Sequence, residues 1–220
     1  MTTKKLLITL LMDNPGSWFV PHARELGRQL RERGHEVTVI EDPQDLPRGD
    51  IAFFLSCEQM VKRDVRERNA HNIVIHASAL PHGKGWSPTT WQILEGKHEI
   101  PLTLFEAVDK TDAGDIYDTA SIALEGHELI DEVRRKEGEA IIALALRFVD
   151  AYPSATGRAQ TGDESFYPKR APKDSELEPK KSLAELFDQL RVADNERYPA
   201  FFTHRGHTYV LKISKKDNEK

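Results

Sequence analysis

Short apolar runs alternate with turn residues through the first half of the chain, and this alternation limits the fold more than any other feature. Residues 6–12 form a nearly continuous apolar run, which is typical of a strand buried on both faces. A helix is predicted over residues 17–33, because apolar side chains recur on one face and Gly34 follows. Those side chains are Phe19, Ala23, Leu26 and Leu30. Three further strands are predicted, at residues 37–40, 51–55 and 73–76. This order predicts an α/β fold with a doubly wound, mostly parallel sheet.

The second half continues this pattern and then changes in character. A short helix is predicted over residues 88–94 and a long helix over 129–152, with strands at 102–108 and 116–124. We therefore assign residues 1–153 to one α/β domain. Residues 154–181 contain three prolines, many charges and few large apolar residues, which predicts an extended linker.

Residues 182–220 are predicted to form a separate appendage. Ser182 and Glu185 form a capping box at the start of a helix with apolar side chains on one side, namely Leu183, Leu186, Phe187 and Leu190. Residues 200–203 and 208–213 predict a β-hairpin that turns at Arg205-Gly206, with Tyr209, Leu211 and Ile213 facing one way. An amphipathic helix and a short sheet edge often seek a partner, so we expect a homodimer.

Composition and charge exclude several classes of protein. The 220 residues carry a net charge of −5 and 39% are hydrophobic, as in an ordinary globular protein. No apolar run approaches the roughly 20 residues of a membrane-spanning helix, and the start is typical of a buried strand rather than a signal peptide. The single cysteine, Cys57, excludes an intramolecular disulfide framework and a multi-cysteine zinc site. We expect a soluble cytoplasmic protein with no membrane segment and no broad nucleic-acid surface.

His76 and Asp112 are the candidate catalytic residues. His76 ends a predicted strand, and ligands bind beyond the carboxyl ends of strands in parallel α/β sheets. Asp112 lies between two later strands, in a loop expected near the same edge. A histidine beside a carboxylate can act as an oriented base, whereas a hydrogen-bonded structural histidine is the commoner alternative.

His71, His76 and His82 are spaced too irregularly for a zinc site, so no metal is expected. Cys57 is a weaker candidate nucleophile, because a small buried residue is common at the end of an apolar strand.

Two segments around these residues resemble the folate-dependent formyltransferases of the methionyl-tRNA formyltransferase type. Residues 75–88 resemble the family's H-x-S-x-L-P…G…P segment, through His76, Ser78, Leu80, Pro81, Gly85 and Pro88. Residues 103–116 resemble its D-x-G-D-I segment, and Asp112 follows His76 by the 36 residues expected of the catalytic pair. Residues 167–175 and 198–202 resemble sugar- and tRNA-directed members. The run GKGWSP at 83–88 is most similar to small nucleotide-sugar N-formyltransferases and the related formylation domain of a peptide synthetase.

The resemblance implies a function. It implies an enzyme that transfers a formyl group from N10-formyltetrahydrofolate to the amine of a nucleotide-linked aminodideoxy sugar, in surface-glycan or pseudaminic-acid-type biosynthesis. His76 would stabilise the oxygen of the tetrahedral intermediate or relay a proton, and Asp112 would orient His76. The alternatives are a methionyl-tRNA or other amine formyltransferase, and a non-catalytic module that binds folate or a nucleotide sugar. The net charge and an appendage of only about 40 residues argue against tRNA.

Position within the family also assigns binding residues. The folate would lie against Gln59, Met60, Val61, Val108, Asp109 and Asp115, although Met60 and Val61 also fit a core role. The acceptor would contact Ser78, Lys84, Trp86 and Arg170, with Lys84 at a diphosphate and Trp86 stacked on a sugar or base. The alternatives are a solvated Lys84 and an Arg170 that forms a salt bridge within the linker.

One residue departs from the family's pattern. Val74 stands where the family carries an asparagine that helps to hold the oxyanion. Asn72 would point to the same face of the strand, but about 13–14 Å from His76 along it. Loss of one such donor lowers a rate by about 10²–10³-fold. Either a backbone N–H, Ser78 or a residue from another loop replaces it, or the protein is weakly active or inactive.

Overall fold

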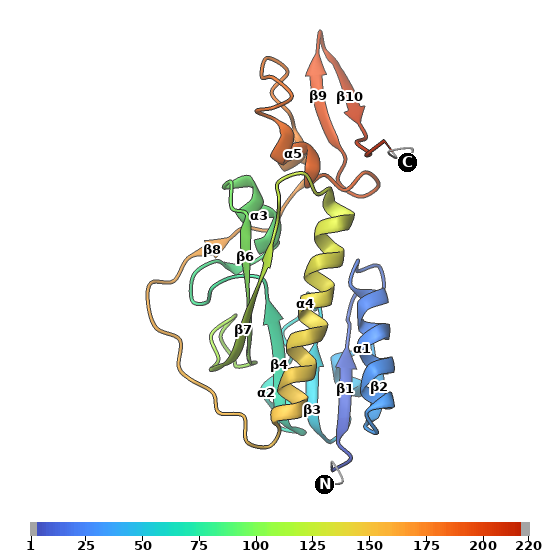
Figure 1. Cartoon of the computed structure of the whole chain (residues 1–220), viewed down its shortest axis with the longest axis vertical. Helices are drawn as coiled ribbons and strands as arrows, with labels where there is room; N and C mark the ends of the chain where they lie inside the picture. The colour runs from blue at the N-terminus through green and yellow to red at the C-terminus, as the bar shows by residue number, and fades with distance from the viewer. Residues whose placement is uncertain (1–3, 217–220) are drawn as a thin grey trace.

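A six-stranded sheet forms the centre of the computed structural model, which describes residues 4–216 (Figure 1). Its strand order is β2-β1-β3-β4-β6-β7. The strands are β1 (Leu7–Leu11), β2 (Glu36–Ile40), β3 (Gly49–Phe54), β4 (Asn69–His76), β6 (Glu99–Glu106) and β7 (Ile116–Ala123). The first four strands are parallel, whereas β6 pairs antiparallel to β4 and β7 antiparallel to β6. The predicted α/β fold with a mostly parallel sheet is confirmed.

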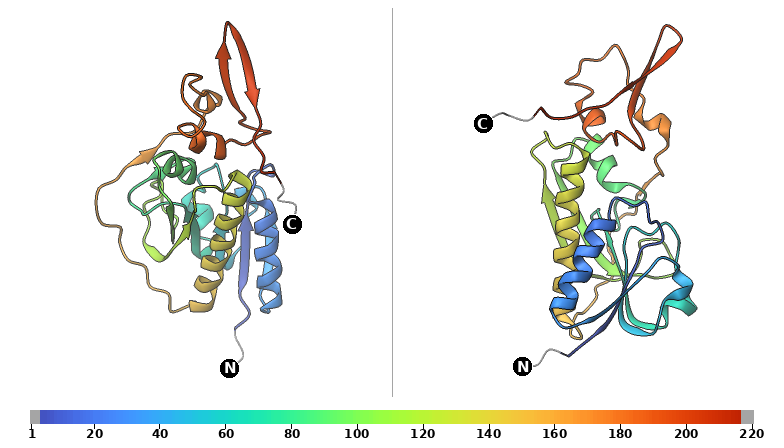
Figure 2. Two further views of the ribbon diagram at one scale, coloured as in Figure 1. Left: turned by 45° about the horizontal axis from the view of Figure 1, so that its top comes forward. Right: turned by 90° about the vertical axis from the view of Figure 1, so that its right-hand side faces the viewer.

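Two long helices cover one face of this sheet (Figures 1 and 2). They are α1 (Val20–Glu32) and α4 (Ile130–Ala151), and the predicted apolar face of α1 is buried, with Leu26 and Leu30 fully inaccessible. The helix starts three residues later than predicted, because the Ser17 hydroxyl accepts a hydrogen bond from the Phe19 N–H before the first turn. A large core cluster fills the space between the two helices and the sheet.

The opposite face of the sheet has a lighter cover than a doubly wound fold predicts. A smaller cluster packs there, formed by Leu11, Leu46, Ala52, Phe54, Val61 and Val65. The helices beside it are short, namely α2 (Arg63–Arg66) and the 3₁₀ helix η1 (Pro43–Asp45). Neither was predicted, because four residues or fewer do not display a helical period.

The predicted linker, residues 154–181, runs in an extended path along the outside of the domain (Figure 1). It is nevertheless bonded to the domain at several points. Arg158 pairs with Ile116, and the two-residue strand β8 (Phe166–Tyr167) pairs in parallel with β5 (Lys84–Gly85). A 3₁₀ helix, η2 (Pro172–Ser175), follows. The segment therefore contributes side chains to the region around His76.

The appendage contains a shorter helix than predicted. Its capping box forms, since the Ser182 N–H donates to Glu185 Oε2 over 2.8 Å and the Glu185 N–H donates to Ser182 Oγ over 3.3 Å. The α-helix α5, however, spans only Phe187–Arg191, and the side chain of Leu183 is 71% exposed. The expectation that Leu183 packs inward is therefore wrong. The residues between it and α5 form turns, which leave Leu183 on the outside.

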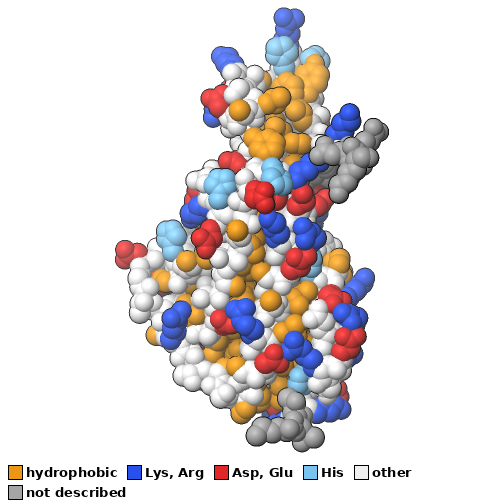
Figure 3. Space-filling view, in the orientation of Figure 1, with side chains coloured by type: hydrophobic (Ala, Val, Ile, Leu, Met, Phe, Trp, Pro, Cys, Tyr) orange, Lys and Arg blue, Asp and Glu red, His pale blue; other side chains and the backbone are white. Residues whose placement is uncertain are grey.

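The predicted hairpin is confirmed as β9 (Ala200–His204) and β10 (His207–Leu211). Arg205 and Gly206 both have positive φ, 49° and 82°, as a tight two-residue hairpin turn requires. The hairpin projects from the body of the molecule (Figure 2). Tyr209 and Val210 remain 47% and 60% exposed, and apolar side chains gather over the appendage in the space-filling view (Figure 3).

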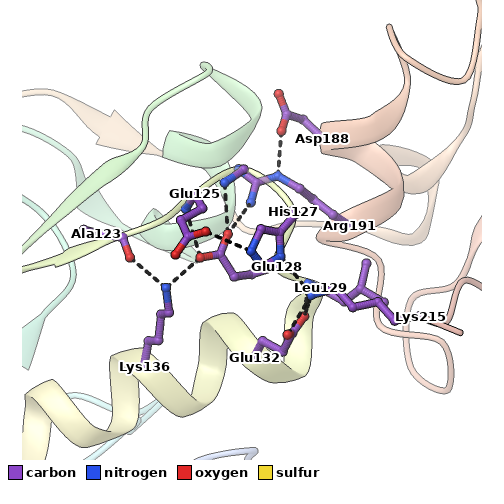
Figure 4. A network of polar contacts seen from close by, with 11 residues as sticks. Ala123, Glu125, His127, Glu128, Leu129, Glu132, Lys136, Asp188, Arg191 and Lys215 are labelled. Atoms are coloured by element: carbon purple, nitrogen blue, oxygen red, sulfur yellow. Dashed lines mark hydrogen bonds and ion pairs between the residues drawn. The ribbon is translucent and has the colours of Figure 1, made fainter. Parts of the chain in front are cut away.

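A buried carboxylate joins the appendage to the domain (Figure 4). Glu128, 2% exposed, accepts hydrogen bonds from the backbone N–H groups of Glu125 and Gly126 and from Lys136 Nζ at 2.6 Å. Its other oxygen lies 3.8 Å from Nη1 of Arg191, itself 1% exposed. Although burial raises the pKa of Glu128, the hydrogen bonds from Lys136 and the backbone outweigh it and lower the pKa to about 2.

Among residues 4–216, no helix is both long and apolar enough to cross a membrane.

Candidate active site

The fold brings His76 and Asp112 together, as predicted. His76 Nε2 lies 3.9 Å from Asp112 Oδ2, and the two side chains are only 10% and 13% exposed. The path by which the Asp112 loop reaches His76 was not predicted. Because β6 runs antiparallel to β4, the Asp112 loop starts beside the middle of β4, where the Ala107 N–H donates to Asn72 O over 2.7 Å. The loop then returns along the sheet to reach His76.

The glycine-rich segment 83–85 orients both side chains. His76 Nε2 lies 2.9 Å from the carbonyl oxygen of Gly83, which can only accept, so Nε2 carries the proton. In the neutral ring, Nδ1 is then the free proton acceptor. The Gly85 N–H donates to Asp112 Oδ2 over 2.9 Å. One short segment thus holds the imidazole and the carboxylate in a fixed relation.

The shape of the Asp112 loop explains the glycine in its D-x-G-D motif. A Cβ atom on Gly114 would lie 1.7 Å from the carbonyl oxygen of Glu106, so no other residue fits without movement of the backbone. Asp112 itself has a φ of +48°. The linker secures this loop, because Gln160 Nε2 donates to the carbonyl oxygens of Asp112 and Gly114 over 3.0 and 2.9 Å. The sequence contained no signal for this role of Gln160, which lies 48 residues beyond Asp112.

Strained backbone is concentrated at this site. Within residues 4–216, four non-glycine residues have positive φ, and three of them are Ser56, Ser87 and Asp112. Ser56 and Ser87 line a cavity that also includes His76, and Asp112 contacts His76. Residues held in the left-handed region cluster at active sites and ligand clamps, where the surrounding structure maintains them.

The cavity has a volume of about 340 Å³ and lies between the α/β domain and the appendage. Its walls come from the segment before α1, the loop after β3, the end of β4, the start of α3 (Pro88–Leu94), one side of α4 and the chain after β8. Four cationic side chains line it, namely Arg134, Lys169, Arg170 and Arg197. Three carboxylates also line it, namely Glu58, Glu137 and Asp194. The volume suits a small molecule.

Two of the four predicted acceptor residues, Trp86 and Arg170, line this cavity. Lys169 Nζ lies 4.1 Å from the centre of the Trp86 ring and 3.2 Å from Glu58 Oε2. Arg170 donates to the Asp174 carbonyl and the Ser175 hydroxyl, both over 3.3 Å, while its buried Nε has no hydrogen-bond partner within the described chain. Burial lowers the pKa of Arg170. Such a guanidinium is incompletely satisfied and favours an anionic partner.

The other two predicted acceptor residues lie elsewhere. Lys84 is 1% exposed and its Nζ lies 2.8 Å from Glu164 Oε1, so the alternative of a solvated lysine is wrong. Ser78, also 1% exposed, lines a second cavity of about 310 Å³ beside His82 and Tyr167. Neither side chain lines the cavity that contains His76, because β5 and β8 turn this part of the loop away from it. The sequence motif located Ser78 and Lys84 in the loop after β4, but it did not indicate which way their side chains point.

The two loops predicted to hold the folate lie side by side. Thr111 Oγ1 is 3.9 Å from Met60 Sδ, and Asp109 forms an ion pair with Arg66. Met60 is 55% exposed, which rules out the core alternative for it, whereas Val61 is 5% exposed and belongs to the smaller core cluster.

The remaining predicted folate residues have different degrees of exposure. The Gln59 N–H donates to Asp13 Oδ2 over 2.7 Å, Val108 is half-buried and Asp115 is exposed. Contact of these six residues with folate stays a prediction.

The side chains of β4 do not supply an amide beside His76. Val74 packs against apolar neighbours that include Phe105. Asn72 is committed elsewhere, because its Nδ2 donates to the carbonyl oxygen of Arg66 over 3.0 Å.

Cys57 lines the cavity, but burial raises the pKa of its thiol to about 12, which leaves the sulfur protonated and a poor nucleophile at neutral pH.

Several residues of the site were not predicted. Arg134 and Glu137 come from α4, and the only signal for Glu137 is its place between Val133 and Ile141 on the buried face of that helix. Asn14 and Ser17 come from the turn before α1, and Asp194 from the chain after α5. Polar residues in such turns carry no signature of the cavity that they line.

Comparison with known proteins places these features in context. No family model matches the chain. It is 28% identical over 120 residues to a methionyl-tRNA formyltransferase of Streptococcus pneumoniae, which is 53% of this chain and 39% of that protein. The chain therefore matches less than half of the length of this relative.

Solved structures match over nearly the whole chain. A methionyl-tRNA formyltransferase from Clostridium thermocellum has a TM-score of 0.80 at 20% identity, over 97% of this chain and 95% of that one. HypX from Aquifex aeolicus in complex with tetrahydrofolic acid has a TM-score of 0.78 at 19% identity, over 96% and 38%. A sugar N-formyltransferase from a Shewanella species has a TM-score of 0.69 at 13% identity, over 97% and 99%. The relative found by sequence is a methionyl-tRNA formyltransferase, the structural neighbours include methionyl-tRNA and sugar formyltransferases, and the chain has the formyltransferase fold.

Proposed function

We propose that this protein is a folate-dependent N-formyltransferase. It transfers the formyl group of N10-formyltetrahydrofolate to the amine of a nucleotide-linked aminodideoxy sugar. The observation that carries the proposal is the His76–Asp112 pair, 3.9 Å apart, beside a cavity of about 340 Å³ in a formyltransferase fold. The structure of HypX in complex with tetrahydrofolic acid supports the choice of donor.

The geometry around His76 suits such a transfer. The neutral amine of the acceptor attacks the formyl carbon, which gives a tetrahedral intermediate with a negatively charged oxygen. His76 Nδ1, left free by the bond from Nε2 to Gly83 O, accepts the amine proton. The bond from the formyl carbon to N10 then breaks, the carbonyl forms again, and N10 receives the proton that His76 took from the amine. Asp112, fixed by the Gly85 N–H, lies beside the imidazole and orients it.

The charges of the cavity support a phosphate-bearing acceptor. Lys169, Arg170 and Arg197 approach it from the chain after β8, and Arg170 has an unpartnered Nε. Guanidinium groups bind phosphate through paired hydrogen bonds, and Trp86 offers an aromatic face to a sugar or base. The sugar N-formyltransferase among the structural neighbours supports an amino sugar as the acceptor. Surface-glycan or pseudaminic-acid-type biosynthesis is the corresponding pathway class that we propose.

Methionyl-tRNA is the alternative acceptor. The small appendage does not argue against it, because the solved methionyl-tRNA formyltransferase from Clostridium thermocellum is matched over 95% of its chain. The argument from net charge remains: at −5, the chain lacks the excess of cations on which phosphate-backbone binding depends. We therefore prefer a small-molecule acceptor.

Release of tetrahydrofolate that depends on the acceptor tests the reaction. The panel holds UDP- and dTDP-linked 3-amino and 4-amino sugars and charged initiator tRNA. We expect turnover with one sugar and a loss of about 10²–10⁴-fold in His76→Ala. His98→Ala, at an exposed histidine outside both the cavity and the hairpin, is the matched control and should retain full activity. Full activity of His76→Ala would refute its role, and turnover only with tRNA would refute the sugar.

A non-catalytic binding module is the second candidate function, and Val74 is the observation that favours it. With Val74 in an apolar cluster and Asn72 bonded to Arg66 O, β4 offers no amide donor to an oxyanion at His76. This candidate predicts folate binding by calorimetry without formyl transfer to any amine of the panel. Transfer to any acceptor excludes it.

We also propose that the protein forms a homodimer through the hairpin of β9 and β10. Its exposed Tyr209 and Val210 and the outer edge of β10, which pairs with no other strand among the described residues, are the supporting observations. Light scattering should give twice the chain mass of 25.0 kDa, and Val210→Lys should reduce it to the monomer. A monomeric mass for the unaltered protein would refute the proposal.

A further inference from the structure

Glu137 is a buried acid on the inner wall of the cavity. It lies on α4 in line with Val133 and Ile141, both buried, and it is itself only 9% exposed. It lines the same cavity as His76. A carboxylate in an apolar stripe of a helix lowers stability unless a partner compensates it, so its presence calls for an explanation in terms of what the cavity holds.

The described protein supplies no cation that neutralises this acid. No lysine, arginine or histidine nitrogen of residues 4–216 forms an ion pair with Glu137 within 4.0 Å. Arg134, one turn away, is engaged with Asp194 at 2.9 Å and Asp131 at 3.8 Å. The hydroxyl of Thr89, which lines the same cavity and is 8% exposed, has no hydrogen-bond partner within the described chain. Glu137 and Thr89 are thus two incompletely satisfied polar groups that line the cavity.

The distribution of charge indicates what this wall meets. Arg134 of α4 and Asp194 of the chain after β8 both line the cavity and pair with each other, which leaves, among the described residues, the unpartnered Nε of Arg170 on the side of the chain after β8 and the unpaired Glu137 on α4. A ligand that satisfies both walls carries an anionic group at one end and N–H or O–H donors at the other. A phosphorylated amino sugar has both kinds of group.

We propose that Glu137 is an acceptor-binding residue, whose carboxylate accepts a hydrogen bond from an N–H or O–H group on the sugar of the acceptor. The inference rests on the proposed function and adds to it, because it assigns recognition of the sugar to α4. Thr89 offers a second polar contact at the same place. Burial raises the pKa of Glu137 to about 7, so the group is partly ionised at neutral pH, and a donor that binds it favours the ionised form.

Steady-state kinetics of Glu137→Gln test this assignment. The amide has the same shape but a weaker acceptor oxygen, so we expect KM for the amino-sugar acceptor to rise about 10- to 100-fold. We expect KM for N10-formyltetrahydrofolate to stay unchanged. Glu139→Gln, on the exposed side of the same helix, is the matched control and should leave both constants unaltered. An unchanged acceptor KM, or an equal rise for acceptor and folate, would overturn the inference.

Binding measured without turnover separates this inference from the proposed function. Calorimetry with the same nucleotide-linked amino sugars should show a Kd raised about 10- to 100-fold in Glu137→Gln, whether or not formyl transfer occurs. The corresponding nucleoside diphosphate without the sugar should bind both proteins equally. If the unaltered protein binds the amino sugars but transfers no formyl group, the proposed function fails while Glu137 is still tested. Equal affinity of both proteins for every amino sugar would refute the role of Glu137.

Discussion

Replacement of Glu137 by glutamine should change the pH dependence of stability. In the folded protein, burial is the main reason that the pKa of Glu137 rises from 4.5 to about 7, with smaller opposing effects of Thr89 and Arg134. Between these two values, the folded chain binds more protons at this site than the unfolded chain does. The contribution of Glu137 to the free energy of unfolding is therefore greatest below pH 4.5 and is lost as pH rises through 7.

The size of the effect follows from the difference between the two pKa values. One pKa unit corresponds to about 1.4 kcal/mol, so the full loss is about 3 kcal/mol, of which about 2.5 kcal/mol falls between pH 5 and pH 8. A glutamine at this position does not ionise. Relative to the unaltered protein, Glu137→Gln should thus gain about 2.5 kcal/mol in free energy of unfolding between pH 5 and pH 8.

Urea unfolding followed by circular dichroism at pH 5 and pH 8 measures this gain. Every other titrating group is common to both proteins and cancels in the difference. Glu139→Gln controls for the removal of a charge from the exposed side of α4 and should show a difference near zero at both pH values. A constant difference between Glu137→Gln and the unaltered protein at the two pH values would refute the reasoning. The carboxylate would then ionise without a cost of burial. A gain at pH 8 together with weaker acceptor binding would show that a functional residue lowers stability.

Three further substitutions test the site and its supports. Asp112→Asn keeps a hydrogen-bond acceptor but loses the charge beside His76, and should lower kcat about 10²-fold or more at unchanged stability; an unaltered kcat would remove Asp112 from the reaction. Gly114→Ala forces the loop away from Glu106 O and should reduce kcat at least tenfold with intact far-ultraviolet circular dichroism, whereas normal turnover would show that the loop tolerates the shift. Glu128→Ala removes the acceptor of Lys136 and of two backbone N–H groups, although Asp188 still pairs with the buried Arg191, and should cost about 2–3 kcal/mol of unfolding free energy in urea; a cost below 1 kcal/mol would contradict the role of Glu128 in joining the appendage to the domain.

The position of Glu128 and Arg191 also connects stability to the site. Arg191 immediately precedes Val192, and Val192 and Asp194 both line the cavity. The polar cluster in Figure 4 therefore holds the chain after α5 against the domain and completes one wall of the cavity. Buried charges held by several directional hydrogen bonds, as Glu128 is, can fix position where apolar contacts would permit sliding.

Most helices and strands of this protein were predictable from local patterns of residues. Residues 7–11, the apolar face of α1 and the Arg205-Gly206 turn were predictable, because each depends on a local pattern: burial on both faces, a 3.6-residue period, or positive φ at a glycine. The pairing of His76 with Asp112 was also predictable, since both belong to short motifs with a characteristic separation. Their contact at 3.9 Å needed only that the two loops reach the same edge of the sheet.

Tertiary structure decided the rest of the site. The antiparallel direction of β6, the burial of Lys84 against Glu164 and the bonds from Gln160 to the Asp112 loop join residues that lie far apart in the chain. Hydrophobic periodicity reports which face of a helix or strand is buried, but it does not report what that face meets. The sequence therefore shows a charged side chain such as Glu137 only as a break in the apolar pattern of its helix. The cavity beside it, which the sequence does not reveal, explains its presence. The identity of its neighbours depends on packing between distant segments, and no local pattern of residues encodes that packing.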